Sequence, residues 1–183
     1  MADRPLRADA QRNRDKVLRA AQEAFAASGY AVPLDEIAAM AGVGPGTVYR
    51  HFPSKEELFE AVATARLRDI IEAARGLADD PEPGPAFFGF LGRFREEVTA
   101  KRDLPDVIAI PGSLQEELHA ALDLLLRRAQ RAGAVRADIT TPDLLALLKG
   151  IARTVNDGPP GPADQGLAGR LLAVVTDGLR PRA

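Results

Sequence analysis

The sequence predicts an all-α protein. Apolar side chains recur every three or four residues along most of the 183-residue chain, which is the periodicity of amphipathic helices. No stretch of alternating β-branched or aromatic residues, bounded by turn residues, indicates a strand. Clusters of proline and glycine divide the periodic stretches. We therefore expect about nine helices, arranged as a group of three short helices, a long connecting helix and a larger helical body.

The first helix is expected over residues 10–28. Val17, Ala21 and Phe25 lie on one stripe at the spacing of a helix face, and charged side chains occupy the other faces. Gly29 follows at a position where a left-handed residue ends many helices.

Two short helices follow, at residues 34–41 and 45–51. Gly42 is placed to end the first of them. Pro45 stands in the first turn of the second, where a missing N–H is harmless.

A long fourth helix is expected to run to about Leu77. Ser54, followed three residues later by Glu57, forms the pattern of a capping box at its start. The proline-rich residues 79–85 should then form a loop. We place an N-terminal domain at 1–54 and a C-terminal domain at 55–183. The C-terminal domain should contain, after the long helix, five helices over residues 86–102, 104–110, 113–132, 142–156 and 163–179.

Composition excludes several classes of site. The chain has no cysteine, which rules out disulfides, thiolate metal sites and a cysteine nucleophile. Its two histidines, His51 and His119, are far apart in the sequence. We therefore expect no metal, no cofactor and no enzymatic activity. No apolar run is long enough to span a membrane and the first residues are charged, so we expect a cytoplasmic protein.

Charge is distributed unevenly along the chain. The formal net charge is −2, yet residues 1–55 hold eight Lys/Arg against six Asp/Glu, and the remainder holds sixteen against twenty. Most such charges solvate exposed helix faces. The imbalance is small and only indicates where contacts to nucleic acid would lie.

Residues 34–53 carry the pattern of a helix-turn-helix. Two helices that cross closely need a small residue at the crossing, a glycine at the turn and apolar residues below. Ala38, Gly42, Val43 and Val48 meet these needs in order, with Ile37 beneath them. In this motif the second helix enters the major groove of DNA.

The second helix would present polar residues to DNA. Gly46 allows close approach of the backbone, Thr47 offers a hydroxyl or a methyl group, and Arg50 suits guanine or phosphate. Lys55 would bind phosphate at the start of the next helix. Alternatively, Tyr49 and Phe52 are core aromatics and His51 is a surface residue. The order of the residues favours DNA contacts at Pro45, Gly46, Thr47, Tyr49, Arg50, His51 and Lys55.

The run from Ile37 to Phe59, IAAMAGVGPGTVYRHFPSKEELF, resembles the signature of the TetR family of bacterial transcription regulators. The resemblance also includes Ala24-Phe25 and Gly29-Tyr30. It implies an all-helical homodimer that binds a palindromic operator and responds to a small-molecule effector. It also implies DNA contacts at the seven positions named above. Gly44 departs from the pattern, because many members have a serine there as the helix N-cap.

The C-terminal body offers a candidate effector pocket. Phe87, Phe88, Phe90 and Phe94 are concentrated in one stretch, with Gly89 and Gly92 among them. This stretch is equally consistent with a plain aromatic core. The family resemblance favours a cavity lined by Phe87, Phe90, Leu91, Phe94, Val107, Leu118 and Leu122. Arg95, His119 or Arg153 would supply a polar contact.

The last two helices, at residues 142–156 and 163–179, carry many apolar residues. They are too apolar for a solvated edge, so we expect a partner surface. The resemblance implies that the partner is a second copy, packed as a four-helix bundle.

These features favour a ligand-responsive DNA-binding regulator, a repressor released from its operator by an inducer. An all-helical interaction or small-molecule-binding protein that does not bind DNA remains the alternative. An enzyme is disfavoured, because no motif places a nucleophile, a base or a carboxylate pair.

Overall fold

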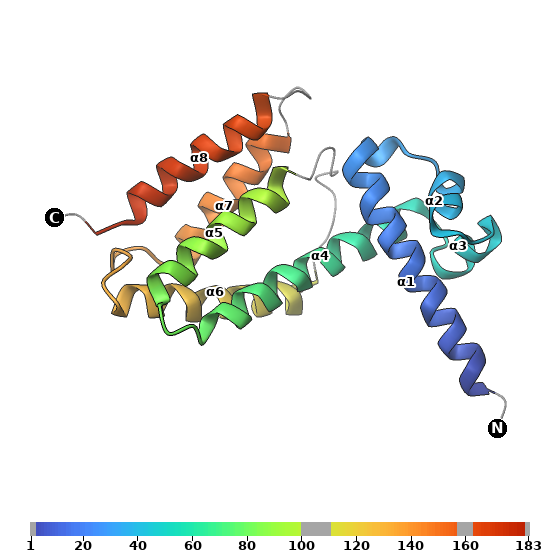
Figure 1. The fold of residues 1–183 in the computed structure, drawn as a ribbon, viewed down its shortest axis with the longest axis horizontal. Coiled ribbons are helices and arrows are strands. Elements are labelled where there is room, and N and C mark those ends of the chain that lie inside the picture. The colour runs from blue at the N-terminus through green and yellow to red at the C-terminus, as the bar shows by residue number, and fades with distance from the viewer. Residues whose placement is uncertain (1–2, 100–110, 157–162, 182–183) are drawn as a thin grey trace. The chain divides into compact units, whose positions relative to one another are not determined.

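A computed structural model describes residues 3–99, 111–156 and 163–181 (Figure 1). Within these ranges all regular secondary structure is helical and no strand is present, which confirms the all-α prediction. The described residues contain eight α-helices and one short 3₁₀-helix: α1 (Asp3–Ser28), η1 (Gly29–Ala31), α2 (Leu34–Ala41), α3 (Pro45–His51), α4 (Lys55–Ala78), α5 (Pro83–Thr99), α6 (Gly112–Arg131), α7 (Thr141–Asn156) and α8 (Ala163–Leu179). The helix expected at 104–110 lies outside the described residues.

Two helices begin earlier than the sequence predicts, for the same reason. Helix α1 starts at Asp3 instead of residue 10, and α5 starts at Pro83 instead of residue 86. In each case prolines lie in the first turn, where their missing N–H groups would have no helical acceptor. The interpretation of residues 79–85 as a loop is therefore wrong for the last three of them.

The described residues form two compact units, 3–65 and 66–99 with 111–156 and 163–181. The division lies inside α4. Leu58, Phe59 and Val62 of α4 belong to the core of the first unit, whereas Ile71 and Ala74 belong to that of the second. The first packing unit thus extends beyond residue 54, where we placed the end of the N-terminal domain.

The core of the first unit joins α1, α2, α3 and the start of α4. Phe25 of α1 and Phe59 of α4 meet edge to face, with ring centroids 5.1 Å apart. Val48, the buried residue of α3, is 0% exposed. Because α3 packs against both α1 and α2, burial of this one side chain fixes which edge of α3 faces solvent.

The turn between α2 and α3 depends on Gly42. This residue has φ +66, the left-handed conformation predicted for it. The N–H of Gly42 donates to the carbonyl of Ala39 at 3.1 Å, and that of Val43 to Ala38 at 3.0 Å. These bonds satisfy carbonyls at the end of α2 and turn the chain into α3.

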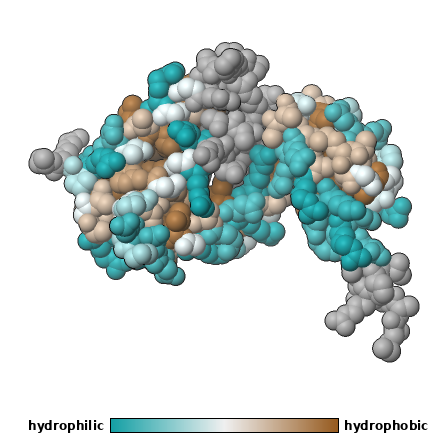
Figure 2. All heavy atoms as spheres, viewed as in Figure 1, coloured by the Kyte–Doolittle hydropathy of each residue, from teal (hydrophilic) through white to brown (hydrophobic). Residues whose placement is uncertain are grey.

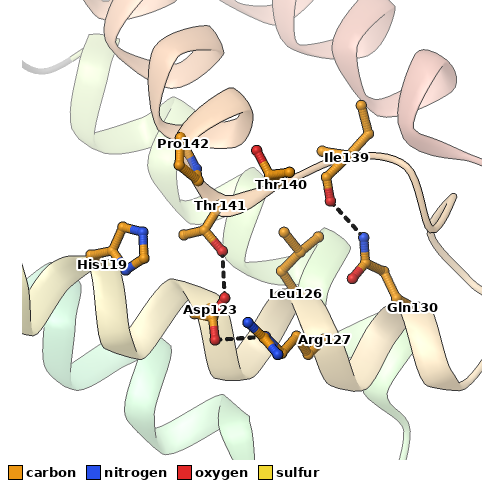
Figure 3. Close-up of a pocket in the computed structure, with 9 residues that line it drawn as sticks. All are labelled: His119, Asp123, Leu126, Arg127, Gln130, Ile139, Thr140, Thr141 and Pro142. Atoms are coloured by element: carbon orange, nitrogen blue, oxygen red, sulfur yellow. Dashed lines mark hydrogen bonds and ion pairs between the residues drawn. The ribbon is translucent and has the colours of Figure 1, made fainter.

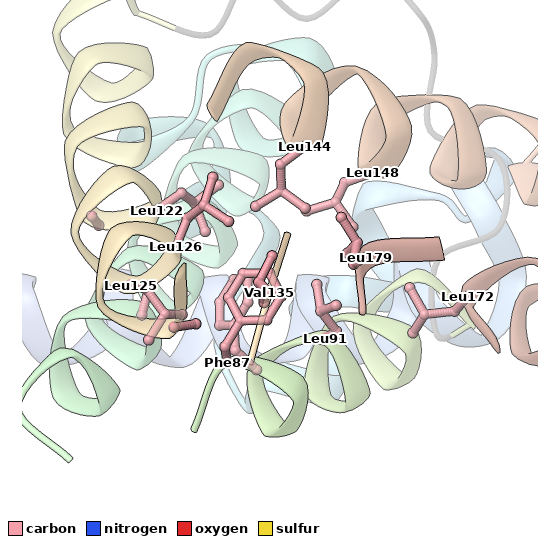
Figure 4. Packing of buried hydrophobic residues seen from close by; sticks show 14 of the residues in the cluster. Phe87, Leu91, Leu122, Leu125, Leu126, Val135, Leu144, Leu148, Leu172 and Leu179 are labelled. Carbon is pink, nitrogen blue, oxygen red and sulfur yellow. The ribbon is translucent and has the colours of Figure 1, made fainter. Parts of the chain in front are cut away.

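The core of the second unit lies among α5, α6, α7, α8 and the second half of α4 (Figure 4). Helix α5 packs against α6, α7 and α8, and α7 packs against α6 and α8. Large side chains from these helices converge at the centre: Phe87, Leu91, Leu122, Leu126, Leu144, Leu148, Leu172 and Leu179. In the part of the chain that is described, no helix is long and apolar enough to cross a bilayer.

Two glycine substitutions should have opposite effects on stability. Gly42→Ala should destabilise the protein by about 1–2 kcal/mol, because an L-residue is strained at this φ. Gly76 lies in the interior of α4 with open space around its Cα, so Gly76→Ala should stabilise by up to about 1 kcal/mol. Urea unfolding followed by far-ultraviolet circular dichroism measures both. Equal stability of the two variants would contradict the role assigned to Gly42.

Candidate nucleic-acid interface

Helix α3 presents a mostly polar edge to solvent. Pro45, Gly46, Tyr49 and Arg50 are exposed, and Thr47 and His51 are half-buried. Tyr49 is 50% exposed, whereas Phe52 is buried at 3%. The core interpretation of these two aromatics therefore holds for Phe52 and fails for Tyr49. Of the residues predicted to contact DNA, six lie on α3 around the buried Val48 and Lys55 opens α4, and their contacts with DNA stay a prediction.

Backbone groups define the start of α3. Gly44 occupies the N-cap with extended φ and ψ of −70 and 149, and no side chain caps the helix there. The N–H of Thr47 donates to the carbonyl of Gly44 at 2.8 Å. One turn on, Nε of Arg50 donates to the carbonyl of Gly46 at 3.1 Å. This bond aligns the Arg50 side chain along α3.

The start of α4 is capped as the sequence predicts. Oγ of Ser54 accepts a hydrogen bond of 3.1 Å from the N–H of Glu57. The remaining N–H groups of this first turn and the helix dipole attract anions. Lys55, the first residue of α4, is half-buried and stands where a phosphate contact was predicted.

Tyr30 of η1 contacts both residues that open α4. Nζ of Lys55 lies 4.6 Å from the centroid of the Tyr30 ring. The Tyr30 hydroxyl donates to Oε1 of Glu56 at 2.7 Å. This hydrogen bond, together with burial and the negative charge of Glu56, raises the pKa of Tyr30 to about 12. The same bond lowers the pKa of Glu56.

Sequence reasoning missed two residues of this region, Tyr30 and Arg14. Cζ of Arg14 lies 5.1 Å from the centroid of the Phe52 ring, so a cation from α1 lies beside the residue that follows α3 in the chain. Tyr30 belonged to the quoted family signature, yet nothing in the sequence indicated its contact with Lys55. Both contacts join residues that are distant in the chain and leave no local pattern.

In the second unit, the residues predicted to line an effector pocket pack into the core. Phe87, Phe90, Leu91 and Leu122 are at most 2% exposed, and Phe94 and Leu118 pack against the same cluster. Val107 lies outside the described residues. A side chain added at Gly89 or Gly92 would meet nothing within 4 Å, so close packing does not explain these glycines. The role of the set in ligand binding stays a prediction.

A different pocket lies between α6 and the start of α7 (Figure 3). Its volume is about 490 Å³, and none of the predicted effector residues lines it, although His119 does. Asp123 accepts a hydrogen bond of 2.8 Å from the buried Thr141 hydroxyl and pairs with Arg127 at 2.7 Å. Burial raises the pKa of Asp123, but these two partners outweigh it and the net pKa is lowered.

The polar residues of this pocket form hydrogen bonds that stabilise the second unit. Nε2 of Gln130 donates to the carbonyl oxygen of Ile139 at 2.8 Å (Figure 3) and to that of Arg136 at 3.0 Å. Together with the Asp123–Thr141 bond, this holds the segment before α7 against α6. Among the described residues, no group of three or more His, Asp or Glu side chains could hold a metal ion.

The first unit thus defines a helix-turn-helix protein of the DNA-binding class, and comparisons with known proteins agree. Residues 17–62 match the profile of bacterial regulatory proteins of the tetR family. Residues 82–181 match the C-terminal domain of SbtR-like transcriptional regulators. This second match covers more than half of the chain, and the chain belongs to the TetR family.

Solved structures of family members are similar over nearly the full chain. A TetR transcription regulatory protein from Mycobacterium vanbaalenii is 40% identical, with a TM-score of 0.69 over 97% of this chain and 100% of that one. A TetR transcriptional regulator from Streptomyces coelicolor is 35% identical, with a TM-score of 0.71 over 93% and 99%.

Curated relatives extend the comparison. The repressor AcnR of Corynebacterium efficiens is 28% identical over 92% of this chain and 94% of its own length. The matches to the regulators YhgD of Bacillus subtilis and UidR of Escherichia coli span only 31% and 38% of those proteins.

The Tyr30–Glu56 bond should be visible in a pH titration. The chain has two tyrosines and no tryptophan, so in Tyr49→Phe only Tyr30 ionises. Its tyrosinate absorbance should appear with a midpoint near 12, and adding Glu56→Gln should move the midpoint toward 10.0. Since the folded-state pKa of Tyr30 is the higher one, its part of the stabilisation is complete below pH 10 and is lost as pH rises through 12. Since the folded-state pKa of Glu56 is lowered, the stabilisation is also lost when acid protonates its carboxylate.

Circular dichroism at each pH is the control that the protein is still folded. A midpoint near 10.0 in folded Tyr49→Phe would contradict the hydrogen bond.

Proposed function

We propose that this protein is a DNA-binding transcriptional regulator, a repressor that a small-molecule inducer releases from a palindromic operator. The observation that carries the proposal is the edge of α3, where Val48 is fully buried while Tyr49 and Arg50 are exposed. An edge of this kind fits the major groove, with Lys55 beside it for phosphate. The name of the relative AcnR, a transcriptional repressor, supports repression as the direction of control.

Helix α4 supports a coupling between effector and DNA. It is continuous from Lys55 to Ala78, and its two halves lie in the cores of the two units. An inducer held in the second unit would favour a conformation of α4 in which the two α3 helices of a dimer no longer fit major grooves about 34–36 Å apart. This mechanism needs only different affinities of the two conformations for inducer and DNA.

A homodimer formed through α7 and α8 is part of the proposal. Val174 of α8 is 71% exposed and Leu147 of α7 is 40% exposed. Figure 2 shows brown apolar patches among teal side chains on the second unit. Burial against a second copy would remove such residues from water and place two α3 helices about a two-fold axis. We place the protein in the cytoplasm, where its operator would be.

Alanine substitutions in the interface should weaken operator binding. Thr47→Ala, Tyr49→Ala and Lys55→Ala should each cost about 1 kcal/mol or more of binding free energy. Lys55→Ala should also reduce the salt dependence by about one released ion. Fluorescence anisotropy with a DNA site selected from a random pool measures both quantities.

Arg131→Ala is the matched control, because it removes an exposed cation from α6, which belongs neither to the DNA-binding edge nor to the proposed dimer surface. Failure to select any palindromic site, or unchanged binding by all three variants, would favour the helical interaction protein that does not bind DNA.

The dimer surface can be tested with two aspartates. Val174→Asp should give a monomer in sedimentation velocity, because an apolar interface does not accommodate an unpaired carboxylate. Leu124→Asp is the matched control, since Leu124 is 47% exposed but lies on α6. A Val174→Asp variant that remains dimeric would argue against this surface.

A further inference from the structure

The contact among Tyr30, Lys55 and Glu56 goes beyond what the helix-turn-helix pattern requires. Ser54 already caps α4, and the rings of Phe25 and Phe59 already close the core. The polar atoms of Tyr30 and Glu56 are nevertheless aligned at 2.7 Å, and the ammonium of Lys55 lies against the same ring. One side chain from η1 therefore restrains two consecutive, oppositely charged residues of α4.

Lys55 and Glu56 create an electrostatic conflict at a phosphate site. They are neighbours in the chain, so a phosphate in contact with Lys55 lies within the Debye length of about 8–10 Å from Glu56. The carboxylate would repel that phosphate while the ammonium attracts it. Glu56 is exposed. Its carboxylate also interacts with its own N–H and with Ser54, so without the Tyr30 hydroxyl it would keep only these two contacts at the start of α4, beside the predicted phosphate site.

Tyr30 is anchored well enough to hold both charges. Its ring lies 5.2 Å from Phe59, edge to face, and stacks on Phe25 at 6.2 Å. It is half-buried, so its position is set by the core of the first unit. A cation–π contact at a solvent-accessible site is weak, so the half-buried Lys55 remains able to meet an anion.

We propose that Tyr30 is a positioning residue for DNA binding, whose ring holds the Lys55 ammonium and whose hydroxyl holds the Glu56 carboxylate. A phosphate at the start of α4 then meets the cation, with the anion bonded to η1. The inference rests on the proposed function, because it concerns the same DNA-binding surface.

A double-mutant cycle tests this role in the full chain. Tyr30→Phe keeps the ring and its packing but removes the hydroxyl that holds the Glu56 carboxylate to η1, and leaves that carboxylate only its contacts with Ser54 and its own N–H. Affinity for the selected operator should therefore fall about three- to fivefold at low salt. The loss should shrink as salt is added. Glu56→Gln alone should change affinity less than about twofold, and Tyr30→Phe combined with Glu56→Gln should restore binding to nearly that of the original protein.

The rescue separates positioning from a purely structural role. If Tyr30 only supported the fold, Tyr30→Phe would lower the melting temperature and neutralising Glu56 would restore nothing. Unchanged operator affinity in Tyr30→Phe, or a loss that Glu56→Gln does not reverse, would overturn the inference while the proposed function stands. Failure of the original protein to bind DNA would overturn both.

Discussion

The DNA-binding geometry of this protein depends on the burial of one valine. Helix α3 has seven residues, which is too few for a stable helix in isolation. Its conformation and direction come from Val48, which packs with Ile37 and Ala38 of α2 and with the aromatic core of α1 and α4. Burying Val48 leaves Tyr49 and Arg50 on the open edge by helical geometry alone. The residue that α3 buries therefore determines which of its side chains are exposed.

Around this helix, aromatic side chains serve both packing and electrostatics. Phe52 lies in the core, and its ring makes a cation–π contact with the guanidinium of Arg14. Tyr30 packs on Phe25 and Phe59 and carries the ammonium of Lys55. The rings are fixed by the core, so the cations beside them gain defined positions at little conformational cost. The aromatic rings of the first unit therefore restrain the positions of Arg14 and Lys55, two of its few basic side chains.

The second unit combines an apolar core with side-chain hydrogen bonds at its edge. The aromatic stretch of α5 lies in the interior with leucines of α6, α7 and α8. Hydrogen bonds of Asp123 and Gln130 hold the start of α7 and the segment before it against α6. Helix α4 contributes to this core and to that of the first unit. A rearrangement of side chains in the second unit would therefore act on a helix that the DNA-binding unit also requires.

The sequence by itself determined the helical class, the turn at Gly42, the cap at Ser54 and the exposed edge of α3, because each depends on residues a few positions apart. Only the tertiary structure decided that Tyr30 meets Lys55 and Glu56, and that Arg14 meets Phe52. It also placed the division of the chain inside α4, and Phe87, Phe90, Leu91 and Leu122 of the predicted pocket in the core of the second unit. These features arise from contacts between segments that are distant in the chain. Several segments could pack on the same apolar surface, and no local sequence pattern shows which of them does.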